Sequence, residues 1–188
     1  MDVNALTHTG DSIERCIATP VKIGNPVNGT VFDTYGIWDT GATDSAITKK
    51  AAKELGLAPI SIAKVHGVHG AQYVNVYLVN ITLNNQNITL STRVSECEYL
   101  NTEKGDEAGL LIGMNIITKG DFCISNHQGK TVMTFRVPSL EKIDYVSEIN
   151  EHNRLYKIHT AWMRSGNSKC PCGSGKQYKN CHGKSKYS

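Results

Sequence analysis

The chain has 188 residues, 39% of them hydrophobic and 20% charged, which is typical of a globular protein with one ordinary domain and an appendage. No apolar run approaches the roughly 18 residues of a membrane span, and the polar start MDVNALTHTGD is unlike a signal peptide. The sequence is therefore expected to belong to neither a membrane protein nor a secreted one, and its six cysteines predict reduced thiols in the cytoplasm.

The net charge of +3 is divided unevenly along the chain. Residues 1–151 hold 12 Lys and Arg against 17 Asp and Glu, whereas residues 152–188 hold 8 Lys and Arg and no acid. A mildly acidic body thus carries a basic tail. Such a tail favours contact with nucleic acid, a ribosome or an acidic protein surface, or it is simply solvated.

Most of the chain predicts short β-strands separated by turn residues, with an N-terminal arm over residues 1–12. One short helix is expected over residues 46–55, ended by Gly56. A helical linker is expected within residues 138–165 and a small tail over residues 166–188. The strands are expected over residues 13–23, 30–38, 73–83, 88–94, 122–125 and 131–137.

The linker carries an apolar stripe at roughly helical spacing, broken between Asn150 and Asn153. The stripe either packs against the main domain or adds to a dimer interface, and it is too short for the three heptads of a coiled coil. It consists of Leu140, Ile143, Val146, Ile149, Leu155, Ile158 and Trp162.

Two strings distinguish the main domain from an ordinary small β domain. The first is Ile-Trp-Asp-Thr-Gly-Ala, centred on Asp39, Thr40 and Gly41, and the second is Leu-Leu-Ile-Gly-Met-Asn at residues 110–115. In this order they resemble the retropepsin family of aspartic proteases, in which an Asp-Thr-Gly loop and a later hydrophobic-hydrophobic-Gly turn cross at the active site. The resemblance covers roughly residues 13–137. It implies a mainly β fold, a closed barrel that forms one half of an acid protease.

The resemblance also implies hydrolysis of peptide bonds by a water molecule held between two aspartates. Carboxylates about 3 Å apart cannot both ionise, so they share one proton, and aspartic proteases are the standard example of such a pair. One carboxylate acts as base toward the water while the other gives its proton to the substrate carbonyl, without a cofactor. Thr40 is expected to hydrogen-bond to the partner loop, and Gly41 allows the backbone to run beside the carboxylate.

One chain supplies only one convincing Asp-Thr-Gly. Asp33 is six residues from Asp39, in the strand that feeds the same loop, and cannot be the second aspartate. The enzyme is therefore expected to be a two-fold homodimer with one Asp39 from each subunit, acting on a protein or peptide. Monomers are expected to be inert.

A glycine-rich flap covers the substrate in this family, and the resemblance places it at His66, Gly67, Val68, His69 and Gly70. The two histidines are interpreted as exposed or substrate-facing residues. Metal binding is the alternative, but no cysteine or carboxylate joins them locally.

The chain departs from the family at two positions. Many viral members pair an aspartate, two residues after the first-motif glycine, with an arginine directly after the second-motif glycine. Thr43 and Met114 stand there, so both charges are absent and neither is left buried alone. The strength of the dimer is therefore open, and the neighbours Asp44 and Asn115 are expected only to form hydrogen bonds.

The last nineteen residues hold three thiols and one imidazole within thirteen residues. A Cys₃His set fills the tetrahedral shell of zinc and leaves no position for a catalytic water. The string is similar to the SEC-C motif, the zinc-binding tail of the bacterial preprotein translocase motor. By this resemblance the ligands are Cys170, Cys172, Cys181 and His182, and the zinc is structural. A free-thiol or redox-active tail is the alternative.

These features predict a homodimeric aspartic endopeptidase whose zinc tail docks on a partner. A ribosome or an export chaperone is the expected partner, by analogy with the motor. The alternative is a catalytically silent adaptor of retropepsin fold, which has no chemical reason to retain Asp39. A zinc protein that binds nucleic acid is a third interpretation, weakened by the lack of a basic helix long enough for a groove.

Overall fold

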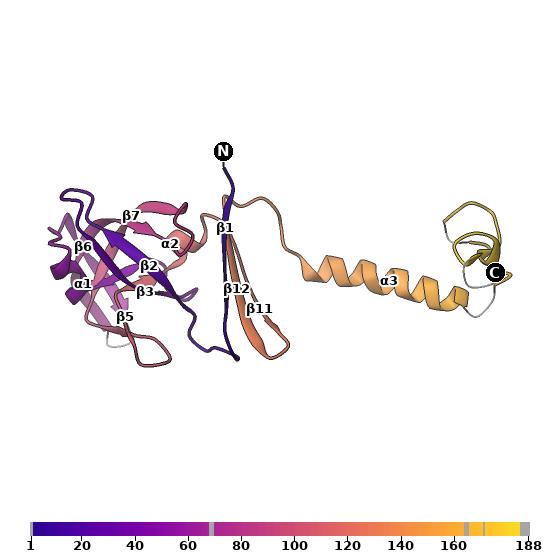
Figure 1. The fold of residues 1–188 in the computed structure, drawn as a ribbon, viewed down its shortest axis with the longest axis horizontal. Helices are drawn as coiled ribbons and strands as arrows, with labels where there is room; N and C mark the ends of the chain where they lie inside the picture. Colours follow the sequence, from indigo (N-terminus) through magenta and orange to yellow (C-terminus); the bar gives the residue numbers. More distant parts are fainter. Residues whose placement is uncertain (1, 68–69, 164–165, 171, 185–188) are drawn as a thin grey trace. The chain divides into compact units, whose positions relative to one another are not determined.

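The computed structural model describes residues 2–67, 70–163, 166–170 and 172–184 (Figure 1). The chain divides into two compact units, Met1–Glu141 and Lys142–Ser188. The first unit is built mainly of β-strands, which confirms the predicted fold class, and the second contains a helix followed by the tail.

The strands of the first unit are short, apart from the long β6. Two short helices, α1 (Lys49–Glu54) and α2 (Met114–Ile117), interrupt them. In chain order the strands are β1 (Asn4–Thr9), β2 (Ala18–Gly24), β3 (Val31–Trp38), β4 (Ala46–Thr48), β5 (Ser61–Gly67), β6 (Gly70–Thr82), β7 (Thr89–Cys97), β8 (Leu100–Asn101), β9 (Glu107–Ala108), β10 (Leu110–Ile112), β11 (Asp121–His127) and β12 (Lys130–Val137).

The larger sheet has the strand order β2-β3-β10-β4-β7-β6-β5, and β2 also pairs with β6. Closure into a complete barrel stays a prediction. Strand β10 runs parallel to β3, from Leu110↔Gly36 to Ile112↔Trp38, and antiparallel to β4. This arrangement places the two motif strings side by side, because one leaves the end of β3 and the other leaves the end of β10.

The alternation predicted for the strand over residues 73–83 is present in β6. Val79 and Ile81 are fully buried, whereas the preceding Leu78, on the other face of the strand, is exposed. Successive side chains of a strand point to opposite faces, so β6 contributes one face to the core. The same core cluster includes Leu6 of β1 and Phe135 of β12.

A smaller sheet has the order β1-β12-β11, and these strands lie side by side in Figure 1. Strand β1 lies within the segment expected to be an arm, and it pairs with β12 of the same chain from Asn4↔Val137 to Thr9↔Val132. The N-terminal segment is therefore part of a sheet and contributes to the core of the first unit.

Two predicted elements were wrong at their starts. Residues 46–48 were expected to begin a helix, but they form β4, where Ala46 pairs with both Leu111 and Ser95. Residues 13–17 were expected to begin a strand, but β2 starts only at Ala18. In both places contacts with distant parts of the chain outweigh the local pattern.

One short helix was predicted for this domain, and the structure contains two, α1 and α2, among its described residues. Helix α1 begins after Thr48, whose side-chain oxygen accepts a hydrogen bond from the backbone N–H of Ala51. A second helix, α2, follows Gly113 directly. It carries the chain from the second motif toward β11.

The second unit contains α3 (Tyr145–Met163) and a 3₁₀ turn, η1 (Tyr178–Asn180). Within the expected linker, residues 138–165, the helix begins only at Tyr145, because the carboxylate of Asp144 accepts the backbone N–H of Ser147. Val146, Ile149 and Leu155 of the predicted stripe are exposed. No helix in the described part of the chain is both long and apolar enough to cross a membrane.

Candidate active site and metal centre

Asp39 is the first residue after β3. Its backbone N–H donates to the carbonyl of Ile112 at 3.0 Å, which extends the pairing of β3 with β10 by one residue. Its carboxylate oxygen Oδ1 accepts the backbone N–H of Gly41 at 2.8 Å. The side chain is half-buried. The backbone of Asp39 is thus fixed to β10, its carboxylate is oriented by the N–H of Gly41, and the residue stays partly accessible.

Trp38, the last residue of β3, fixes the start of this loop through its buried side chain. Its indole N–H donates to the hydroxyl of Thr19 at 3.0 Å, and its ring stacks on Phe122 with centroids 5.4 Å apart. Its backbone N–H donates to the carbonyl of Ile17 at 2.9 Å. A buried aromatic with a satisfied polar atom fixes the end of β3, and with it the position of the next residue, Asp39.

The loop after Asp39 is bound to the turn at Gly113, so the two motif strings meet. The backbone N–H of Met114 donates to Ala42 at 2.8 Å, and that of Asn115 donates to Thr43 at 3.0 Å. Met114 and Thr43, which replace the charged pair of viral members, therefore take part through their own backbones. No charge is needed to hold the two loops together here.

A buried side-chain link reinforces this contact. The hydroxyl of Ser45 accepts the backbone N–H of Gly113 at 3.0 Å and donates to Oδ1 of Asn115 at 2.7 Å. The same Asn115 oxygen accepts the N–H of Ser45. Sequence reasoning assigned Ser45 no role. Its place six residues after Asp39, in a run of small polar residues, is the only local signal.

Gly113 is required by space. A Cβ atom at this position would lie 2.6 Å from the carbonyl carbon and oxygen of Asp44, which are backbone atoms. We expect Gly113→Ala to destabilise the protein by about 1–3 kcal/mol through this overpacking and to reduce cleavage by displacing the Asp39 loop. Thermal melting and peptide cleavage measure the two effects.

The matched control is Gly24→Ala, since a Cβ there meets its nearest atom at 3.7 Å, an ordinary contact. This variant should melt close to the wild type. Equal stability of Gly113→Ala and Gly24→Ala would show that the close approach at Gly113 does not constrain the loop.

The other predicted residues of this site lie as follows. Thr40 is exposed, and its hydroxyl has no partner among the residues that the structure describes. Asp33 points to Lys22, with an ion pair of 3.4 Å, and does not face Asp39 within the loop. These positions agree with the need for a second copy of Asp39, which stays a prediction.

Part of the predicted flap belongs to a paired strand. Strands β5 and β6 pair antiparallel up to Gly67↔Gly70, and Gly70 adopts a φ of 97°, a value that favours glycine. His66 and Gly67 lie at the end of β5. Val68 and His69 lie outside the described residues, as does the side chain of His66, so the contact of this segment with substrate stays a prediction.

The four predicted metal ligands of the tail converge. Their ligand atoms all lie within 4.8 Å of one another, and Cys170 Sγ is 3.2 Å from Nδ1 of His182. Cys181 Sγ is 3.6 Å from Cys172 Sγ. A tetrahedral zinc ion with bonds of about 2.3 Å to sulphur and 2.0 Å to nitrogen places its ligands about 3.5–3.8 Å apart. The donor set and spacing therefore fit zinc.

The tail is built around this cluster. Tyr178 is buried, and a Cβ at Gly183 would lie 2.5 Å from its ring. Gly173 and Gly175 adopt φ values of 76° and 70°, which let the chain curl back between the ligands. The tight backbone leaves room for a metal shell and one aromatic ring, and for little else.

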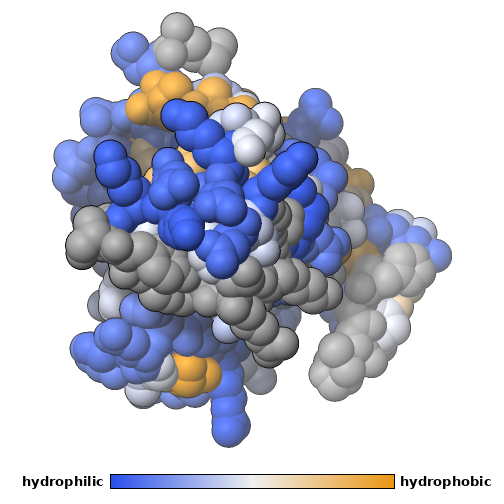
Figure 2. All heavy atoms as spheres, turned by 90° about the vertical axis from the view of Figure 1, so that its right-hand side faces the viewer, coloured by the Kyte–Doolittle hydropathy of each residue, from blue (hydrophilic) through white to orange (hydrophobic). Residues whose placement is uncertain are grey.

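Burial raises the pKa of the Cys170 thiol, but hydrogen bonds from the backbones of Cys172 and His182 outweigh it and lower that pKa to about 7. Zinc binds the thiolate form of cysteine, which Cys170 therefore reaches near neutral pH. Around the cluster Lys169, Lys176 and Lys184 are exposed. Hydrophilic residues make up most of the face shown in Figure 2.

A profile of a family described as aspartyl protease matches residues 20–116, slightly more than half of the chain. The chain belongs to the aspartyl protease family. The matched segment of this aspartyl protease contains both the Asp39 loop and the Gly113 turn, so the resemblance predicted from the two strings is confirmed. A second profile, the SEC-C motif, matches residues 167–184 and confirms the resemblance of the tail.

Curated relatives match this aspartyl protease through short segments. The protein translocase subunit SecA of Ehrlichia chaffeensis is 44% identical over 48 residues, which are 25% of this chain and 6% of the relative. SecA of Rickettsia bellii is 54% identical over 39 residues, which are 20% of this chain and 4% of the relative. The chain thus spans only a small fraction of the length of these relatives.

Two solved structures are similar to the protease. A retropepsin-like aspartic protease from Rickettsia conorii has a TM-score of 0.45 and 13% identity, over 73% of this chain and 97% of that chain. The retroviral protease-like domain of Ddi1 from Leishmania major has a TM-score of 0.43 and 16% identity, over 69% and 97% of the two chains.

Proposed function

We propose that the chain is a homodimeric aspartic endopeptidase. It hydrolyses peptide bonds of a substrate with a water molecule that is activated between two Asp39 carboxylates, one from each subunit. The observation that carries the proposal is the Asp39 carboxylate itself. It is intact, half-buried, oriented by the backbone of Gly41, and set in a loop fixed to the Gly113 turn. A binding protein of the same fold has no use for such an arrangement.

The chemistry follows from pairing the two carboxylates across a two-fold axis. Brought within about 3 Å, they share one proton, so one is a base and the other an acid. The base takes a proton from a bound water, whose oxygen attacks the peptide carbonyl carbon, while the acid protonates the carbonyl oxygen. Collapse of the tetrahedral species breaks the C–N bond as the amine leaves with a proton.

Other residues support this centre. Thr40 is exposed and its hydroxyl has no partner within the described chain, which supports its proposed bond to the second loop across the axis. Residues His66, Gly67, Val68, His69 and Gly70 form the flap that covers the substrate. The reaction itself uses no metal ion or other cofactor.

The tail adds a structural zinc site and a means of docking. Cys170, Cys172, Cys181 and His182 hold the zinc, and the closed Cys₃His shell gives it no reactive position. The exposed lysines around it favour an acidic surface on a ribosome, a chaperone or another protein. Docking of this kind would bring the protease to its substrates in the cytoplasm.

The proposal is tested by incubating the full-length, zinc-loaded protein at micromolar concentration with a diverse peptide library between about pH 3.5 and 7.5, a range that brackets carboxylate pairs. Mass spectrometry should show cleavage, strongest on the acid side and blocked by a statine-type inhibitor. Sedimentation should show a two-subunit species. A monomer that cleaves would contradict the shared pair, and a dimer that cleaves nothing would favour the silent adaptor.

A further inference from the structure

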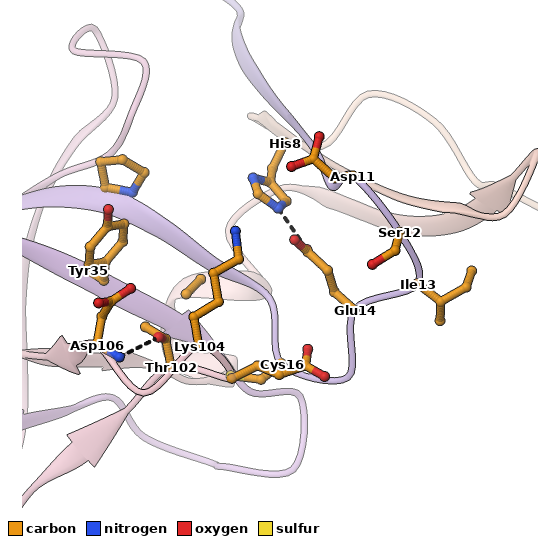
Figure 3. A pocket seen from close by; sticks show the side chains of 13 residues that line it. His8, Asp11, Ser12, Ile13, Glu14, Cys16, Tyr35, Thr102, Lys104 and Asp106 are labelled. Atoms are coloured by element: carbon orange, nitrogen blue, oxygen red, sulfur yellow. Dashed lines mark hydrogen bonds and ion pairs between the residues drawn. The ribbon is translucent and has the colours of Figure 1, made fainter.

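A pocket of about 540 Å³ opens in the first unit between two segments (Figure 3). The chain from β1 to β2 forms one wall and the turn between β8 and β9 forms the other, and Tyr35 of β3 also lines the pocket. Carboxylates outnumber cations in its lining. The carboxylates are Asp11, Glu14, Glu103 and Asp106, and the cation is Lys104; His8 also lines the pocket.

One residue of the pocket lining, Tyr35, lies on β3, the strand that ends directly before Asp39. Tyr35, Ile37 and Asp39 are alternate residues, and alternate residues of a strand share one face. Four residues of strand span about 13 Å. The pKa of Cys16, which lines the pocket, is raised mainly by burial and in small part by the negative charge of Asp39. Tyr35, which lines the pocket, is therefore about 13 Å along the chain from Asp39.

The loop before β2, which carries part of this lining, is fixed in place. The hydroxyl of the buried Thr131 accepts the backbone N–H of Glu14 at 2.9 Å, and the backbone of Thr131 bonds to Gly10 at 2.8 Å and Ser12 at 3.0 Å. The wall is thus tied to β12 and exists before any ligand arrives.

Two of the four carboxylates are occupied by the protein itself. Glu14 pairs with His8 at 2.7 Å, and Glu103 accepts the backbone N–H of Arg15 at 2.9 Å. Asp11 and Asp106, on opposite sides of the pocket in Figure 3, are exposed and have no ion pair within the described part of the chain. These two remain able to receive a cation.

The lining also has contacts suited to a long side chain. The ring of Tyr35 is 41% exposed and Ile13 is 52% exposed, so both present apolar surface to the pocket. Lysine and arginine bury their aliphatic stems on such surface while their charged ends reach polar groups. A cation over a tyrosine ring gains further attraction.

We propose that this pocket binds a lysine or arginine side chain of the substrate, three or four residues from the peptide bond that is cleaved. An extended peptide advances about 3.3–3.6 Å per residue, so four residues cover the distance from Asp39 to Tyr35. The proposal rests on the proposed function, because it assigns a specificity to that same site.

Lys104 supports the charge preference from within the chain. Figure 3 shows its side chain extending into the pocket, and it makes no ion pair among the described residues. Its ammonium group competes with a cation of the substrate for the same lining. Removing this charge should therefore strengthen binding of a basic side chain, whereas removing Asp11 and Asp106 should weaken it.

Binding can be measured without cleavage. N-acetyl-arginine methylamide and its neutral isostere, the citrulline counterpart, are titrated into the full-length, zinc-loaded protein, and NMR follows the backbone amides of Ser12, Tyr35 and Thr102. Only the arginine probe should shift them. Asp11→Asn/Asp106→Asn should weaken its binding about fivefold or more, as expected for two exposed charge pairs, and Lys104→Gln should tighten it.

The control Asp33→Asn/Glu54→Gln removes the same two charges from exposed positions outside the pocket and should bind like the wild type. Equal shifts with both probes, or equal loss in the two double variants, would overturn the proposal. Preferential binding of the corresponding glutamate probe would also overturn the proposal, and would indicate that the pocket binds an anion through Lys104.

Cleavage provides the second readout. For any peptide cut by the wild type, arginine at the third or fourth residue from the cut should give a higher kcat/KM than citrulline, and Asp11→Asn/Asp106→Asn should reduce that ratio. A ratio of one would overturn the inference while leaving the protease intact. Arginine-specific binding without any cleavage would retain the pocket and reject the enzyme.

Discussion

Asp39→Asn should abolish peptide cleavage, with a loss of at least about a thousandfold, because both the base and the acid of the reaction are replaced in every dimer. The fold should survive the change. The carbonyl oxygen of asparagine can accept the same N–H of Gly41 that Oδ1 of the aspartate accepts at 2.8 Å. Melting temperature and sedimentation should therefore match the wild type, and only the rate should change.

The shared site gives this prediction a sharper form. When wild type and Asp39→Asn exchange subunits in equal amounts, about one quarter of the dimers carry two aspartates if association is random and isologous. Activity should then fall to about one quarter, against about one half for chains that work alone. Cleavage rates measured after mixing at several ratios distinguish a quadratic from a linear dependence.

Asp33→Asn is the matched control. It removes an exposed carboxylate six residues earlier, whose partner is Lys22, so it should retain activity and mixing it with wild type should leave the activity per chain unchanged. Loss of cleavage in Asp33→Asn with retention in Asp39→Asn would reverse the assignment of the catalytic residue.

Loss of the metal should unfold the tail and leave the first unit folded. Among the described residues of the tail, only Cys170, Tyr178 and Gly183 are buried, which is far too little for a core that folds alone. In small zinc modules the binding free energy is the folding free energy, about 10–16 kcal/mol. Cys170→Ser/Cys172→Ser should lose one zinc per chain and the dispersed NMR signals of residues 166–184.

The two units can be followed separately in the same variant. Peptide cleavage and the melting of the first unit should stay near the wild-type values, because the described bonds of Asp39 lie within residues 1–141. Cys16→Ser is the control thiol and should keep its zinc. An unchanged metal content in Cys170→Ser/Cys172→Ser, or in a chain that ends before residue 166, would refute the site.

Local sequence patterns were sufficient to predict those parts of the structure that depend mainly on residues close together in the chain. The alternation of side chains along β6 places Val79 and Ile81 on one face of the strand, and both are fully buried in the structure. The spacing of thiols and imidazole reports a metal cluster because all four ligands lie within thirteen residues of one another. In such cases few long-range contacts are needed to determine the outcome.

Segments decided by distant partners could not be predicted. Residues 46–48 directly precede a helical segment and were expected to belong to it, yet Ala46 pairs with Ser95, about fifty residues away. The segment before β2 alternates like a strand, yet Glu14 bonds to Thr131, 117 residues away. Propensity is a weak prior against such contacts.

The candidate site divides in the same way. Asp39 and Gly113 were found because they stand in recognisable strings, and the structure brings these strings together. The link from Ser45 to Asn115 was missed because it joins residues 70 apart and consists of one hydroxyl, one amide and no charge. Ser45 and Asn115 are each an ordinary polar residue beside a motif, and their hydrogen bond can be recognised only when the two loops are known to be in contact.

The pairing of β1 with β12 within one chain has a consequence for control. Each chain completes its smaller sheet and its core from its own residues, so folding does not require a second copy. In the proposed homodimer, association follows mass action, so dilution is expected to separate subunits that remain folded. For an enzyme whose site is shared, activity per chain then rises with total concentration while the folded fraction stays constant. Expression level alone would set how much of the protease is active.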